Sequence, residues 1–79
     1  MPRYYFDIRD GDELYPDEEG LELPDLRAAE VEAATSLAHM ARDKLPTADD
    51  RHQMAIEVRT ADGPLFRAAY IFEISRSIH

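Results

Sequence analysis

One amphipathic stretch, Leu26 to Leu45, lies between two segments in which apolar and polar residues alternate. On a helical wheel its apolar side chains gather on one side and its charged side chains on the other, as in a helix that covers a sheet. Asp25 precedes the stretch as a good N-cap, and Pro46 prevents the helix from continuing. The side chains expected to face inward are Leu26, Ala29, Ala33, Leu37, Met40 and Ala41.

The first alternating segment, Arg3 to Arg9, has the period of two that is typical of a half-buried strand. Asp10 to Asp12 supplies the turn. A two-residue loop at Asp10 and Gly11 would set Ile8 opposite Glu13, whereas a three-residue loop sets Ile8 opposite Leu14. Because residues opposite one another on paired strands share a face, we expect the three-residue loop.

The second alternating segment predicts a longer hairpin, from Gln53 to Thr60 and from Leu65 to Arg76. Pro64 lacks the N–H that would close a two-residue turn at Asp62 and Gly63, so we expect a three-residue loop, 61–63, with a positive φ at Gly63. This loop predicts the pairs Val58 with Phe66, Ile56 with Ala68 and Glu57 with Arg67.

The segment between the first hairpin and the helix is acidic and short. We expect Asp17 to Gly20 to form an exposed loop, and Gly20 to Leu23 to add a short extended piece whose Leu21 and Leu23 touch the core. Together these elements predict an α+β domain, ββαββ, spanning residues 1–79, with a four-stranded, mainly antiparallel sheet. One helix can shield only one face of such a sheet. The strand order stays open.

Composition argues against several classes of binding partner. The 79 residues contain no cysteine and carry a formal net charge of −8, which disfavours binding to nucleic-acid phosphates. The longest apolar run, Ala68 to Phe72, is far too short to span a membrane, and the first residues show no apolar leader segment. We therefore expect a cytoplasmic protein without nucleic-acid or membrane partners.

No pattern indicates catalysis, a cofactor or a metal. The acidic run that begins at Asp10 fails as a calcium loop, because the required Gly and Glu positions hold Tyr15 and Leu21. The three histidines have no ligand-type spacing; we expect His39 on the polar helix face, His52 in a loop and His79 at the terminus. We expect a protein that is not an enzyme and has no cofactor.

The outer face of the sheet, away from the helix, is the better candidate for function. It combines exposed apolar and basic side chains, and we single out four as candidate partner-binding residues: Tyr5, Arg59, Arg67 and Ile71. The alternative is an ordinary solvated sheet face, on which one Ile and one Tyr are unremarkable.

Three stretches of the chain resemble a known group of proteins. Residues 1–11 read MPRYYFDIRDG, residues 16–20 read PDEEG and residues 23–26 read LPDL. In these the chain is similar to short proteins of unknown function from rhizobia and related alphaproteobacteria, and the resemblance covers nearly its whole length. It implies a bacterial cytoplasmic origin and no mechanism, and it transfers no functional residues.

A second resemblance is to HicB-type antitoxin domains, through the turn at Asp10-Gly11, the segment Pro24-Asp25-Leu26 and the Ala-rich helix. It implies inhibition of a small basic RNA-cleaving partner, which an acidic chain suits. The chain lacks the DNA-binding segment that many of them carry, and its second strand is shorter. The leading interpretation is therefore a non-enzymatic domain that acts through protein–protein contact, as a homodimer.

Overall fold

The computed structural model describes residues 1–77 of the chain. Three strands come first: β1 (Arg3–Asp10), β2 (Glu13–Tyr15) and the two-residue β3 (Leu21–Glu22). The helix α1 (Leu26–Lys44) follows, and a 3₁₀ turn, η1 (Leu45–Thr47), leads into β4 (Arg51–Thr60) and β5 (Gly63–Glu73). Asp25 is the N-cap, as predicted: its Oδ1 accepts a 2.8 Å hydrogen bond from the Ala28 N–H.

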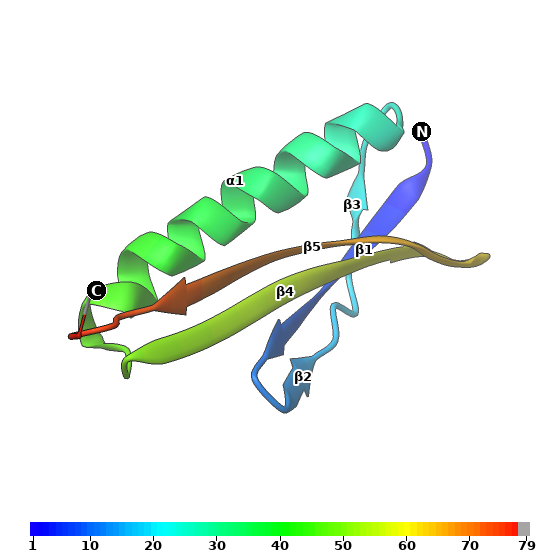
Figure 1. The fold of residues 1–79 in the computed structure, drawn as a ribbon. Helices are drawn as coiled ribbons and strands as arrows, with labels where there is room; N and C mark the ends of the chain where they lie inside the picture. Colours follow the sequence, from blue (N-terminus) through cyan, green and yellow to red (C-terminus); the bar gives the residue numbers. More distant parts are fainter. Residues whose placement is uncertain (78–79) are drawn as a thin grey trace.

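The strands form one antiparallel sheet in the order β2-β1-β4-β5, and β3 pairs with the start of β1. The helix lies along one face, against β4 and β5, and leaves the other face uncovered (Figure 1). The α+β class and the predicted arrangement of two hairpins on either side of one helix are therefore confirmed, with the short β3 as a fifth strand before the helix. The strand order, which the sequence left open, puts β5 at the edge of the sheet.

The core lies between α1 and the helix-facing side of β1, β4 and β5. Ala29 and Ala33 are fully buried, and their small side chains let the helix approach the strands closely. Leu26 was expected in the same stripe but is 48% exposed, because helical side chains tilt toward the N-terminus and the first one projects past the stripe. The buried cluster consists of Tyr4, Ala29, Ala33, Leu37, Met54, Ile56 and Val58.

The register of the first hairpin differs from both alternatives considered above. Ile8 pairs with Tyr15 and Asp10 with Glu13, so the loop is Gly11 and Asp12. Two features explain this register. The Gly11 N–H donates to the Gln53 carbonyl at 3.2 Å, which extends the β1–β4 ladder into the turn. All three residues of β2 are exposed, so burial does not select a face for them.

The second hairpin confirms the predicted pairs, including Val58 with Phe66. Beyond this pair the register shifts by one, so that Thr60 pairs with Gly63 and Leu65 is the extra residue of a β-bulge. The loop is therefore two residues long, not three, and Gly63 has the predicted positive φ, +132°. The strand also ends earlier than predicted, at Glu73.

Candidate functional site

The outer face of the sheet is organised around Arg59, which lies opposite Tyr5 in the β1–β4 pair. The Arg59 Nε donates to Asp7 Oδ2 at 2.8 Å, and Nη2 donates to Asp7 Oδ1 at 3.3 Å. Nη2 also donates to the Asp17 carbonyl at 3.0 Å, and the guanidinium carbon lies 4.6 Å from the centre of the Tyr5 ring. Most of the hydrogen-bonding capacity of this guanidinium is therefore used within the chain.

Asp17 closes the outer edge of β1 between its pairings with β2 and β3. Its Oδ2 accepts from the Phe6 N–H, and its Oδ1 accepts from the Glu19 and Gly20 N–H groups, each at 3.1 Å. Its own N–H donates to Asp7 Oδ1 at 2.9 Å. The prediction of an exposed acidic loop is wrong at Asp17, because its carboxylate accepts the hydrogen bond that a neighbouring strand would otherwise accept from Phe6.

Both carboxylates are held in the charged form. Burial would raise the pKa of Asp7, but the Arg59 guanidinium and the Asp17 N–H outweigh it, so that the pKa lies below its ordinary value. Burial likewise opposes ionisation of Asp17, and its three N–H donors, from Gly20, Phe6 and Glu19, bring its pKa below the ordinary value.

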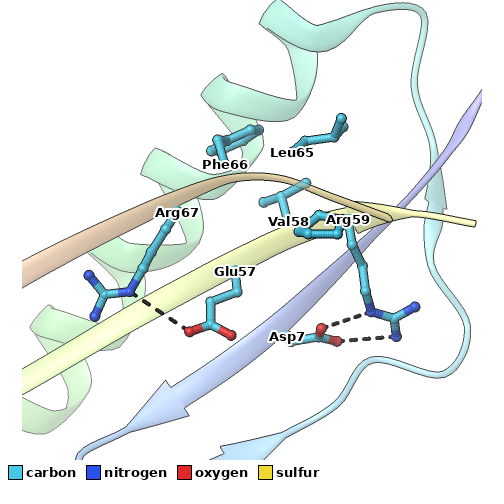
Figure 2. Close-up of a pocket in the computed structure, with 8 residues that line it drawn as sticks. Asp7, Glu57, Val58, Arg59, Leu65, Phe66 and Arg67 are labelled. Atoms are coloured by element: carbon cyan, nitrogen blue, oxygen red, sulfur yellow. Dashed lines mark hydrogen bonds and ion pairs between the residues drawn. The ribbon is translucent and has the colours of Figure 1, made fainter. Parts of the chain in front are cut away.

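A second cluster of charged residues is centred on Glu57, next to a hollow at the β-bulge. Glu57 Oε2 lies 3.0 Å from Arg9 Nε and 3.8 Å from Arg67 Nε. Figure 2 shows Arg67, Glu57, Asp7 and Arg59 on one side of the β4–β5 ribbon. Leu65 and Phe66 lie on its other side. The residues that line the hollow are Asp7, Glu57, Val58, Arg59, Pro64, Leu65, Phe66 and Arg67.

This hollow offers little for chemistry. Its two carboxylates and two guanidinium groups face one another as ion pairs, and its lining contains no hydroxyl, thiol or imidazole group. A hydroxyl or thiol nucleophile with an imidazole base beside it, the common arrangement in covalent catalysis, is therefore missing from the lining. Within residues 1–77 no three His, Cys, Asp or Glu side chains are placed to hold a metal ion.

The histidines are placed differently from one another. His39 is exposed on α1, as expected, whereas His52 lies in β4 rather than in a loop. The His52 Nε2 is 3.5 Å from Asp10 Oδ1, and its ring centre is 6.3 Å from that of Tyr70. His79 lies outside the described residues.

Ile71 belongs to a separate, apolar part of the surface along β5. It is 67% exposed and pairs with Gln53 on β4. Beside it, an open groove runs between α1 and the edge strand. The residues that line this groove are Ala34, Leu37, Ala38, Ala41, Leu45, Ala69, Tyr70, Ile71 and Phe72.

The four candidate residues thus do not form one patch. Tyr5 and Arg59 touch, and Arg59 is committed to Asp7. Arg67 and Ile71 share the outer face of β5, the edge strand. Arg59 lies six residues from the β4 partner of Ile71, which at the usual rise is about 20 Å along the strand. Sequence reasoning missed Asp7 and Asp17, although Asp17 followed by Gly20 has the Asp and Gly positions of a common turn.

Fold and surface together define a small α+β domain whose sheet has one covered edge and one open edge. Within this class, the chain belongs to the family described as Domain of unknown function (DUF6894), whose model matches residues 3–71. Comparison with curated proteins and with solved structures gives no significant match. The part of the chain described here contains no helix long and apolar enough to cross a membrane.

Proposed function

We propose that this protein is a non-enzymatic domain that acts through protein–protein contact and self-associates along β5. The observation that carries the proposal is the difference between the two edges of its sheet. The edge of β1 is covered along its length by β2, Asp17 and β3. The edge of β5, which is eleven residues long, has no neighbouring strand in the described chain.

Soluble proteins usually protect such an edge. The common devices are short edge strands, lysines, prolines, bulges and covering loops. In β5 the proline and the bulge lie at the start of the strand, and the remainder contains no lysine. Ile71 at 67% exposure and the alanine-lined groove beside it make this edge suited to contact with another chain. A bacterial cytoplasmic setting, without nucleic acid or cofactor, belongs to the same proposal.

The test is the molar mass of the purified protein by light scattering after size-exclusion chromatography. The 9.1 kDa chain is expected to elute at twice its mass, and Ile71→Lys to shift it toward monomer without unfolding it. Leu14→Lys is the matched control, because Leu14 is 45% exposed on β2, at the opposite edge. A wild-type monomer, or equal effects of the two variants, would contradict the proposal.

The alternative function is inhibition of a small basic RNA-cleaving protein, in the manner of HicB-type antitoxins. The observation that favours it is the net charge of −8, together with exposed carboxylates at the β1–β2 turn and in the loop that follows. Native co-purification from the source cells separates the two functions. A stoichiometric small basic protein in the eluate supports inhibition, and recovery of the dimer alone supports self-association.

A further inference from the structure

The backbone of β5 shows which of its groups are free to bind another strand. The Ile74 N–H donates to the Asp50 carbonyl at 2.7 Å, so the backbone of residue 74 points toward β4. Backbone direction alternates along a strand, and therefore the even-numbered residues of β5 bond to β4. The odd-numbered residues point their N–H and C=O groups toward the open edge. They are Arg67, Ala69, Ile71 and Glu73.

We propose that two copies of this chain pair through β5, antiparallel, with the twofold axis at Tyr70. This inference rests on the proposed self-association and specifies its register. The axis at Tyr70 places Arg67 of each copy opposite Glu73 of the other, and Ala69 opposite Ile71. Four pairs of odd-numbered residues then exchange about eight backbone hydrogen bonds.

Charge selects this register from its symmetric alternatives. A shift of the axis by one residue in either direction sets Arg67 opposite Ile71 or opposite Ser75. An axis at Arg67 or at Glu73 sets two like charges against each other, which is unfavourable for residues directly opposite on paired strands. Only the axis at Tyr70 gives both charged residues of the edge a partner of opposite sign.

The charges on the neighbouring strands extend the same pattern. Within one chain, Arg67 Nε lies 3.8 Å from Glu57, and Glu73 Oε2 lies 3.3 Å from Arg51 Nε. Pairing at Tyr70 would continue these two contacts into one row across four strands. In this row Glu57 and Arg67 of one copy are followed by Glu73 and Arg51 of the other, so that the sign alternates at every step.

Side-chain size fits the same register. On the outer face the small Ala69 lies opposite the large Ile71, which is 67% exposed in the single chain. On the helix-facing side, Ala68 lies opposite Phe72, and Phe66 lies opposite Ile74, which is 46% exposed. Figure 1 shows the helix on one face of the sheet, and an antiparallel twofold axis would bring the helices of both copies to this same face. The alanine-lined groove would then border the second copy.

The register is tested with two charge reversals in the full-length protein. Arg67→Glu and Glu73→Arg each create like charges in both rows of a homodimer, and each is expected to raise the dimer dissociation constant roughly tenfold. An equimolar mixture restores opposite charges in both rows of a heterodimer. Native mass spectrometry is therefore expected to show the heterodimer well above the half that random association gives.

Each variant also disturbs its own chain, and the design separates the two effects. The change within each chain is the same before and after mixing, so a gain on mixing reports the contact between copies. Arg9→Glu is a further control: it removes the 3.0 Å contact to Glu57 but lies on β1, away from the open edge. It is expected to leave the dimer intact.

The possible results test the proposed register separately from the proposed self-association. A wild-type protein that is monomeric at tens of micromolar overturns self-association altogether. A wild-type dimer that tolerates both reversals, or variants that show no preference for the heterodimer, overturns the axis at Tyr70 and leaves self-association standing.

Discussion

Replacement of Asp17 by alanine removes the carboxylate that closes the β1 edge. Three backbone N–H groups lose their acceptor: the hydrogen bonds from Phe6 and Gly20 are part-buried, and the one from Glu19 is exposed. A hydrogen bond to a charged acceptor contributes about 1.5–3 kcal/mol, and the exposed Glu19 donor and, in part, the half-exposed Gly20 donor regain water. We therefore expect a loss of about 2–3 kcal/mol, out of a total stability of about 4–12 kcal/mol for a chain of this length.

The assay is urea unfolding, followed by far-ultraviolet circular dichroism at one fixed protein concentration. The concentration must be fixed because self-association stabilises the folded chain by mass action. With a slope of about 1 kcal/mol per molar urea for a small domain, the Asp17→Ala midpoint is expected to fall by about 2–3 M. Glu18→Ala is the matched control: Glu18 is the exposed neighbour and lacks hydrogen bonds or ion pairs in the described chain.

Equal urea midpoints for Asp17→Ala and Glu18→Ala would contradict the expected role of the Asp17 carboxylate. Asp17→Asn is a finer test of this role, because an amide keeps the size of the side chain but turns a donor toward one of the N–H groups. If charge and acceptor number matter, Asn recovers only part of the stability. Full recovery by Asn would mean that the shape of the loop, and not the carboxylate, closes the edge.

Three further predictions follow from local geometry. Asp25→Ala should cost about 1 kcal/mol in thermal or urea unfolding, and Asp25→Ser should recover most of it. Gly20→Ala should destabilise the fold by about 1 kcal/mol or more in the same assay, since Gly20 has φ +74° and an added Cβ would lie 2.8 Å from Arg3 Cγ. Folding lowers the pKa of Asp7 and Asp17, so their contribution to the free energy of unfolding is complete above the ordinary pKa near 3.8 and is lost as the pH falls through their folded pKa values. Urea unfolding at pH 6 and below pH 3 should therefore show that Asp7→Asn destabilises the fold less at the lower pH.

The sequence predicted the register correctly where one face of each strand is buried, because burial then decides which residues lie opposite one another. The alternation of apolar residues in β4 and β5 set Val58 opposite Phe66, and the structure has this pair. Pattern reasoning failed where burial is absent. All of β2 is exposed, so apolar matching had no force, and a backbone bond from Gly11 to Gln53 set the register instead.

The candidate site shows the same division. Outward-facing Tyr5 and Arg59 could be assigned to one face from alternation alone, and the structure brings them into contact. Alternation does not say what an outward charge will bind. Asp7 on β1 contacts Arg59 on the neighbouring strand β4, and Asp17 contacts Phe6, eleven residues earlier in the chain. Both contacts depend on the strand order, which periodicity does not encode.

Once the topology is known, the acidic segment is the less suitable place for a partner to bind and the edge strand is the more suitable one. The most conspicuous charged stretch of the sequence contains Asp17, but its carboxylate accepts hydrogen bonds from within the chain and covers the edge of β1. The edge strand β5, with two charged residues among its eleven, is left with a free backbone edge, and these two residues, Arg67 and Glu73, are the ones that the proposed second copy would pair. An open, unprotected strand edge is a template for pairing with another chain, and soluble proteins usually cover or protect such an edge. That asymmetry, more than the net charge, directs the search for function to β5.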